Sequence, residues 1–329
     1  MLVTLGLGLT GCGADDGAAT GPVAAVTPSS VDGTDVSRLL RSLVDDRIAP
    51  AHRALADRAA ALAGVLRGCD DARAAAIDAW RATRLAWDAA AVYRFGPQVD
   101  AHLAANVDHW PLDTTAIDRV LAGDGPLAAV DVEALGSNAR GLPIIESLLF
   151  DAAPLTGRRC EYAVGLAGAI SLDASTVAGG FTAEAAGLAG ADTAIVDILS
   201  MLADAVYRVC DDQMAMPAAA AATVQQGAAL MAMTDIRAQL DEVRAAFGAG
   251  IEPIVHARYA EAPDPLGPAL DQAEQAIDAV GDDLAAAIST DPATVGAAIE
   301  SCRNVRRTFA TTVAAVLGVT LIIPIGDGD

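Results

Sequence analysis

Apolar residues recur at helical spacing along most of this 329-residue chain. Between residues 36 and 66 the larger ones mostly fall three, four or seven positions apart, at Leu39, Leu40, Leu43, Val44, Ile48, Leu55, Leu62 and Leu66. This spacing places them on one face of an amphipathic helix. A second helix is predicted from about residue 71 to residue 93, because Gly96-Pro97 follows and breaks the pattern.

The rest of the chain continues in the same way. We expect shorter helices between residues 98 and 122, interrupted by Trp110-Pro111, and further helices over 130–135, 142–150, 159–170, 194–214, 223–247, 266–288 and 294–317. No run of alternating β-branched residues suggests a strand. Alanine, the strongest helix former, dominates the composition. The sequence therefore predicts an all-α fold.

Two of the predicted helices resemble each other. Residues 75–87 (AAIDAWRATRLAW) and 297–309 (AAIESCRNVRRTF) share Ala, Ala, Ile and two Arg at matching positions, and both carry an acidic and an aromatic residue at matching positions. This match favours a duplicated helical bundle. The alternative is a chance similarity between two alanine-rich amphipathic helices.

The net charge of −22 limits the classes of partner. Nucleic-acid binding depends on Lys and Arg that neutralise phosphates, and binding to anionic lipids depends on a basic patch. We therefore expect no nucleic-acid partner and no polybasic membrane contact. An acidic, well-solvated surface is the simplest interpretation of the charge.

The first residues suggest export. Leu9-Thr10-Gly11-Cys12 fits a bacterial lipobox, in which the cysteine is lipidated and becomes the mature N-terminus. Residues 1–12 are therefore predicted as a lipoprotein signal segment and residues 13–35 as a flexible tether. Because residues 1–9 are short and contain no Lys or Arg, either the true start lies upstream of Met1, which we favour, or the lipobox is a chance match. The prediction is a protein of the bacterial cell envelope, periplasmic or surface-facing, anchored in the lipid bilayer at Cys12.

Four further cysteines remain, at Cys69, Cys160, Cys210 and Cys302. Their spacing matches no zinc pattern, so structural disulfides are favoured in an oxidising compartment. Three pairings are open on the sequence alone.

No common catalytic motif is present. The chain lacks an H-E-x-x-H zinc-protease helix, a G-x-S-x-G nucleophile turn and a glycine-rich nucleotide loop. His102 and His109 would share a face only if one helix ran through both, and Trp110-Pro111 is expected to end that helix. We therefore predict no catalytic residues.

Residues 141–146 (GLPIIE) contain half of a metal-binding pattern. They fit G-x-H-x-x-E with Pro143 in place of the histidine. A His and a Glu three residues apart share a helix face and could bind one metal ion, but proline has no donor atom. Pro143 instead suits the first position of a helix, with Glu146 in its first turn. Glu146 is either such a helix-start carboxylate or the remainder of a site for a divalent metal or iron.

Several segments in order extend this pattern. The predicted helix over residues 79–95 runs into the sequence RFGP at residues 94–97. It is followed by Trp110-Pro111-Leu112-Asp113, by GLPIIESLLF and by Arg158-Arg159-Cys160. The chain then ends with Leu317-Gly318-Val319-Thr320 and a terminal Asp-Gly-Asp. In this order the segments resemble the imelysin family, envelope proteins first classed as peptidases and linked to iron uptake. Pro143 resembles a branch that reads G-L-P-x-x-E.

The resemblance implies an architecture and a site. It implies two four-helix-bundle-like domains, residues 36–180 and 181–329, with a cleft between them, and it implies the pairs Cys69–Cys160 and Cys210–Cys302. Matching segments place six residues around the cleft: Arg94, Trp110, Asp113, Arg140, Gly141 and Glu146. Alternatively, Arg94 and Asp113 form a structural ion pair and Trp110 is a core aromatic residue.

Three functions follow as hypotheses. The leading one is a non-catalytic binding module associated with iron or metal uptake, whose cleft takes a small ligand, a metal or a peptide and which contacts an iron-uptake partner protein. The second is a metallopeptidase that uses Glu146. The third is a structural or partner-docking lipoprotein with a vestigial cleft.

Overall fold

The computed structural model describes residues 33–220, 224–225, 227, 230–258 and 264–321. Every regular element in these ranges is helical, and none of these residues is in a strand. The predicted all-α fold is therefore confirmed for this part of the chain. The predicted signal segment, Cys12 and nearly all of the predicted tether lie outside the described residues.

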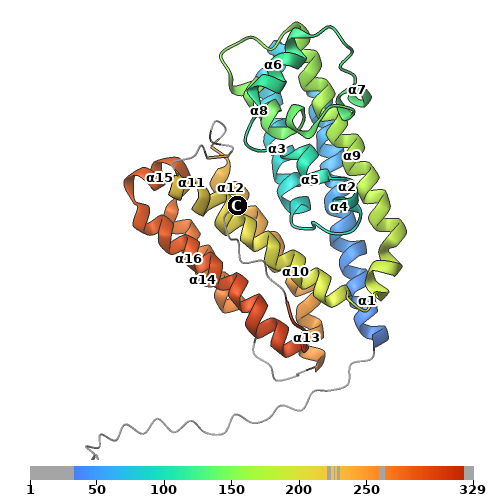
Figure 1. The fold of residues 1–329 in the computed structure, drawn as a ribbon, viewed down its shortest axis with the longest axis vertical. Coiled ribbons are helices and arrows are strands. Elements are labelled where there is room, and N and C mark those ends of the chain that lie inside the picture. Colours follow the sequence, from blue (N-terminus) through green and yellow to red (C-terminus); the bar gives the residue numbers. More distant parts are fainter. Residues whose placement is uncertain (1–32, 221–223, 226, 228–229, 259–263, 322–329) are drawn as a thin grey trace, which may run out of the picture.

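Three long segments build the first group of helices (Figure 1). The first is continuous, from α1 (Gly33–Leu43) through the π-helical η1 (Val44–Ile48) to α2 (Ala49–Leu66). Helix α2 packs against α3 (Arg73–Ala91) and against α9 (Gly157–Gly190). The apolar stripe that the spacing predicts is buried, including Leu55, Leu62 and Leu66.

Helix α9 is much longer than the predicted helix over 159–170. The predicted domain boundary between residues 180 and 181 lies inside it. By length and composition α9 could cross a membrane, but 56% of its most apolar window is buried inside the protein. It is therefore placed as a core helix of the first group.

Short elements connect α3 to α9 and cover one end of the first group. They are α4 (Pro97–Asp100), α5 (Leu103–Val107), α6 (Thr114–Ala122), α7 (Ala129–Glu133) and α8 (Leu142–Phe150). Segment 127–132 lies directly on α9 at Gly165, where an added Cβ would be 2.2 Å from the carbonyl oxygen of Leu127. Glycine is needed there because the two backbones approach so closely.

The second group begins with α10 (Ala194–Tyr207), which continues through the π-helical η4 (Arg208–Ala215) into α11 (Met216–Ala220). It then contains α12 (Ala232–Ala246), η5 (Phe247–Ile251), α13 (Glu252–Arg258), α14 (Gly267–Val280), α15 (Leu284–Thr290), α16 (Pro292–Thr308), η6 (Phe309–Val313) and α17 (Ala314–Leu317). Helix α14 packs on α16, as Figure 1 shows.

Two predicted helices of this group are wrong in extent. The helix expected from residue 223 begins at Ala232, and the described residues before it form turns. The helix expected over 266–288 is broken at Gly281, whose φ of 86° is in the region that favours glycine. A single glycine within an amphipathic pattern did not signal this break.

Both disulfides that the family resemblance implies are present. Cys69 is bonded to Cys160 in the first group, and Cys210 to Cys302 in the second. Each bond joins residues about ninety positions apart, with sequence separations of 91 and 92. Disulfides of this kind persist in oxidising compartments, so they indicate a protein located outside the cytoplasm.

The two groups meet where α3 packs against α12 and where α1 packs against η5. Arg47 donates two hydrogen bonds to the Glu242 carboxylate, at 3.1 and 2.8 Å, and the Tyr93 hydroxyl donates to the same carboxylate. Residues from η1, from the end of α3 and from α12 are thereby joined. This junction between the groups is where the candidate site is found.

Candidate functional site

The GLPIIE segment opens α8 with a backbone that requires glycine. Gly141 has a φ of 110°, and a Cβ there would lie 2.7 Å from the carbonyl oxygen of Val107. Helix α8 begins at Leu142, whose carbonyl oxygen accepts a hydrogen bond of 3.0 Å from the Trp80 indole. The segment is thus fixed between α3 and the end of α5.

The predicted positions of Pro143 and Glu146 within this helix are wrong by one residue. Pro143 is the second helical residue, and Glu146 follows the first turn, which contains no acidic residue. Glu146 is only 5% exposed and is not without a partner. The helix dipole acts mainly on the first turn, so it does not by itself account for this carboxylate.

Other residues assigned to the cleft have structural roles. Arg140 is buried, donates to the carbonyl oxygen of Glu133 at 2.7 Å and forms an ion pair with Asp173. Asp113 caps α6 by accepting from the Ala116 amide at 2.9 Å, and it also accepts from the Asn138 amide at 2.7 Å. These contacts lower the pKa of the Asp113 carboxyl. They hold the loops around α8 in place.

Trp110 and Arg94 complete the six predicted residues. Trp110 is half-buried and precedes a cis peptide bond to Pro111. Arg94 follows the end of α3; the acidic residues that attract it are Asp108, Asp204 and Asp212, whereas the arginine that attracts Asp113 is Arg119, so the predicted alternative of an Arg94–Asp113 ion pair is wrong. Of the six residues, Arg94 lines a pocket at the junction.

The sequence analysis missed a buried polar network at the junction. Arg84, 1% exposed, donates to Asp235 at 3.0 Å and to Asp108 at 2.5 Å, and it lies 3.3 Å from Asp88. Asp108 also accepts from the Trp87 indole at 2.9 Å. Arg84 and Asp88 are four residues apart on α3, a spacing that is typical of exposed ion pairs on a helix surface, so the sequence did not indicate a buried network.

Further polar side chains extend this network. Gln239 on α12 donates to Asp88 at 3.2 Å, and its amide faces that of Gln213. Gln225 donates to Asp108 at 2.7 Å. The network therefore joins α3, the segment after α5, α12 and η4, and it links the two groups of helices through buried, charged hydrogen bonds.

Burial sets the protonation of the network's carboxyl groups. It raises the pKa of Asp88 to about 6, against the attraction of Arg84, which lowers it. Burial and the neighbouring Asp88 raise the pKa of Asp235. Because like charges so close together oppose ionisation, the pair retains a proton at pH values where an exposed aspartate has lost it.

These carboxylates do not fit a resident metal ion. The Arg84 guanidinium already lies among them and supplies the positive charge that a metal would bring. Among the described residues, no three or more His, Cys, Asp or Glu side chains converge in a way that could hold a metal. His102 caps α5 in a left-handed conformation, and α5 ends at Val107, so His102 and His109 do not share a helix.

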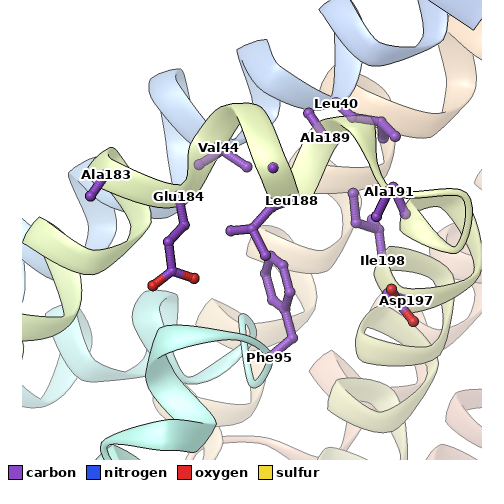
Figure 2. A pocket seen from close by; sticks show the side chains of 12 residues that line it. Leu40, Val44, Phe95, Ala183, Glu184, Leu188, Ala189, Ala191, Asp197 and Ile198 are labelled. Atoms are coloured by element: carbon purple, nitrogen blue, oxygen red, sulfur yellow. The ribbon is translucent and has the colours of Figure 1, made fainter.

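A pocket of about 620 Å³ opens beside Arg94 at the junction. Its walls come from the segment after α3, from the end of α9, from α10 and from α16, and include Phe95, Leu188, Met201, Asp204 and Arg306. A second pocket of about 360 Å³ shares Phe95, Leu188 and Asp197 with it. Figure 2 shows Phe95 and Leu188 side by side in this second pocket. We call the two together the junction groove.

Comparisons with known proteins agree on the fold. The imelysin family model (Peptidase M75) matches residues 48–308. The structure of an imelysin-like protein from Psychrobacter arcticum 273-4 superposes with a TM-score of 0.79 at 17% identity, covering 91% of this chain and 100% of that one.

A second structure is similar. It belongs to a Parabacteroides distasonis ATCC 8503 protein with the provisional name iron-regulated protein A precursor, and it has a TM-score of 0.75 at 15% identity. The match covers 89% of this chain and 97% of that one. No protein of curated function matches the chain.

Proposed function

The chain belongs to the imelysin family, and we propose that it is a non-catalytic binding module of the bacterial cell envelope that serves iron or metal uptake. The observation that carries this proposal is the junction groove, which is lined by the half-buried Arg94 side chain with its buried Nε. Clefts between helical units are common positions for ligands.

The motif helix supports a non-catalytic role. Pro143 replaces the histidine of the pattern, as in the G-L-P-x-x-E branch to which we assign the chain. Glu146 is buried, and the sequence contains no recognisable pair of nucleophile and base. A hydrolase would need a nucleophile and a base within hydrogen-bonding reach of each other and of a substrate. We therefore assign ligand binding, and not hydrolysis, to this protein.

The envelope location rests on the cysteines. The two disulfides indicate an oxidising compartment. Together with the lipobox at Cys12, they support a lipid-anchored protein on the periplasmic or outer face of a membrane. The link to iron rests on the family resemblance and on the name that the Parabacteroides protein carries. We propose that the module contributes a ligand site to an uptake system whose partner protein handles the metal.

We also propose that the two groups of helices arose by duplication. Helices α3 and α16 match at an offset of 222 residues, and equivalent positions are buried in both: Ala76 and Ala298, Trp80 and Cys302, Thr83 and Val305, Trp87 and Phe309. Such a duplication would place one binding cleft at the junction of the two copies, in residues 36–180 and 181–329.

Two measurements test the proposed function. Native mass spectrometry of protein purified from the envelope should detect a small molecule bound one per chain. Casein and insulin B chain should stay intact with both the wild type and Glu146→Ala. Cleavage that is lost in Glu146→Ala, or a full equivalent of metal bound at Glu146, would instead establish the metallopeptidase. Absence of any bound molecule in the wild type would favour a docking lipoprotein with a vestigial cleft.

The association with uptake is tested in the host. Deletion of the gene should slow growth under iron limitation and leave growth in iron-replete medium unchanged. Complementation with Arg94→Gln should fail to restore growth, whereas Arg307→Gln should restore it, because Arg307 is an exposed residue of α16 outside the groove. Equal growth of the deletion strain and the parent would contradict the uptake role.

A further inference from the structure

Arg94 is half-buried and has an unusual environment for an arginine. Its Nε is buried without a hydrogen-bond partner, and no described residue forms a hydrogen bond or ion pair with its guanidinium. Burial lowers the pKa of Arg94, although the more distant Asp108, Asp204 and Asp212 raise it. A buried charge without a partner is costly. Among the described residues, the Arg94 guanidinium therefore has acidic neighbours that attract it but no directly paired counter-ion.

The neighbouring arginine shows the contrast. Arg208 is buried, but it forms an ion pair with Asp204 and donates to the carbonyl oxygen of Ala91 at 2.9 Å. Burial and repulsion from Arg94 lower the pKa of Arg208 to about 9. Since Asp204 is already paired with Arg208, it does not neutralise Arg94. The two guanidinium groups thus repel each other, Asp204 is paired with Arg208, and Asp212 attracts both without a direct contact to Arg94.

The groove next to Arg94 has an apolar wall. Phe95 is held by Phe181, with ring centroids 5.2 Å apart, and Leu188 lies beside Phe95 (Figure 2). Beyond them Leu40, Val44 and Ile198 line the second pocket. The groove therefore offers the Arg94 guanidinium at one end, where Arg306 also lines the wall, and an aliphatic and aromatic surface leading away from it.

Besides Asp204, two acidic residues line the groove, Glu184 and Asp197. Both are exposed, and Asp197 accepts a hydrogen bond of 2.7 Å from Thr193. Exposed carboxylates are solvated and need no counter-ion. A buried guanidinium gains far more from an opposite charge. The two acids are therefore expected to limit affinity for an anion without reversing the preference.

We propose that the junction groove binds a small amphiphilic anion, whose carboxylate or equivalent group pairs with Arg94 and whose apolar body lies along Phe95 and Leu188. This inference rests on the proposed binding function and names the chemical class of its ligand. A carboxylate matches the planar, forked geometry of a guanidinium, and the apolar body would be removed from water against the groove wall.

The test uses four probes with the mature protein in isothermal titration calorimetry. Octanoate should bind one per chain. Octanol, which keeps the apolar body without the charge, and octylammonium, which reverses the charge, should each bind at least tenfold more weakly. Acetate, which has the charge without the apolar body, should show no measurable binding. Octylammonium binding as tightly as octanoate would overturn the proposal, because the acids would then define the site.

Variants locate the binding in the groove. Arg94→Gln should weaken octanoate binding at least tenfold, and Arg94→Lys, which keeps the charge, should weaken it less. Arg307→Gln is the matched control and should leave binding unchanged. Asp212→Asn should tighten binding, because it removes a carboxylate that attracts Arg94. If Arg94→Gln is folded by circular dichroism and binds octanoate like the wild type, the proposal is wrong.

The two proposals fail in different ways. If native mass spectrometry finds a bound small molecule that is neutral or cationic, or if octanoate does not bind, the anion assignment fails and the binding function stands. If the protein cleaves casein in a Glu146-dependent manner, the binding function fails whatever octanoate does.

Discussion

Replacing Arg84 tests whether the buried network holds the two groups of helices together. In Arg84→Met the apolar bulk of the side chain is kept, but Asp88, Asp108 and Asp235 lose the guanidinium that contacts them at 3.3, 2.5 and 3.0 Å. Removal of one partner from a buried ion pair destabilises proteins by about 3–5 kcal/mol, because it leaves an uncompensated buried charge. We expect a loss in this range from the free energy of unfolding at pH 7.5.

The loss should depend on pH with a defined sign. The pKa of Asp88 in the folded protein is about 6, above its ordinary value of 3.8, so the folded state holds a proton that the unfolded state has released. Such a group stabilises the fold at low pH, and this stabilisation is lost as the pH rises through the folded-state pKa. Without Arg84 the carboxyl groups hold their protons more strongly. The difference between Arg84→Met and the wild type should therefore be smaller at pH 5 than at pH 7.5.

Urea unfolding followed by tryptophan fluorescence and by circular dichroism measures both effects. Trp87 donates to Asp108, so its emission reports on the network directly. The control is Arg81→Met on the same helix, where the ion pair with Asp78 is exposed and 3.5 Å long. That change should cost about 0.5 kcal/mol or less. A loss for Arg84→Met no larger than for Arg81→Met, or one independent of pH, would refute the reasoning.

The remaining predictions concern backbone, disulfide and histidine. In thermal melts, Gly141→Ala should destabilise the protein by about 2 kcal/mol or more, because the φ of 110° at Gly141 and the Val107 carbonyl exclude a Cβ. The control Gly64→Ala, in a helix with open space around it, should stabilise the protein slightly. Cys210→Ala should cost about 4–5 kcal/mol in denaturant unfolding, since the bond spans 92 residues. Burial lowers the pKa of His52 from 6.5 to about 4, so the contribution of neutral His52 to the free energy of unfolding is complete above pH 6.5 and is lost as the pH falls toward 4. His52→Phe should remove this pH dependence of stability, and NMR titration of the His52 ring should show no protonation at pH 5.5.

The helices and the disulfides could be predicted because their signals are local or carried by several segments. Long apolar stripes identified α2, α3 and α16, and GLPIIESLLF identified α8 within a residue. The ends of the helices were harder to predict from the sequence. The break at Gly281 and the late start of α12 depend on how the turns pack, which a helical pattern alone does not record.

The candidate site was harder to predict because its contacts are distant in sequence. Arg84 and Asp235 are 151 positions apart, and nothing near Asp235 marks it as buried. One local signal did exist: Trp80 and Trp87 lie three or four residues from Arg84 on α3, a spacing that places this arginine on the same, core-facing side of the helix. Arg140 and Asp113 match the family's segments, but their contacts with Asp173 and Asn138 assign them to loop structure.

Arg84 and Arg94 differ in their surroundings at the junction: Arg84 is enclosed by carboxylates, whereas Arg94 lines the junction groove. Both belong to α3 or its end, but three carboxylates contact Arg84 within 3.3 Å, whereas no described residue pairs with Arg94. Asp108 interacts with both arginines, since it contacts Arg84 directly and attracts Arg94 without a direct contact. The sealed network fixes how the two groups of helices meet and thereby sets the shape of the open groove before any ligand arrives. If the proposed ligand binds there, it finds Arg94 already in position, and its binding energy need not be spent on closing the junction.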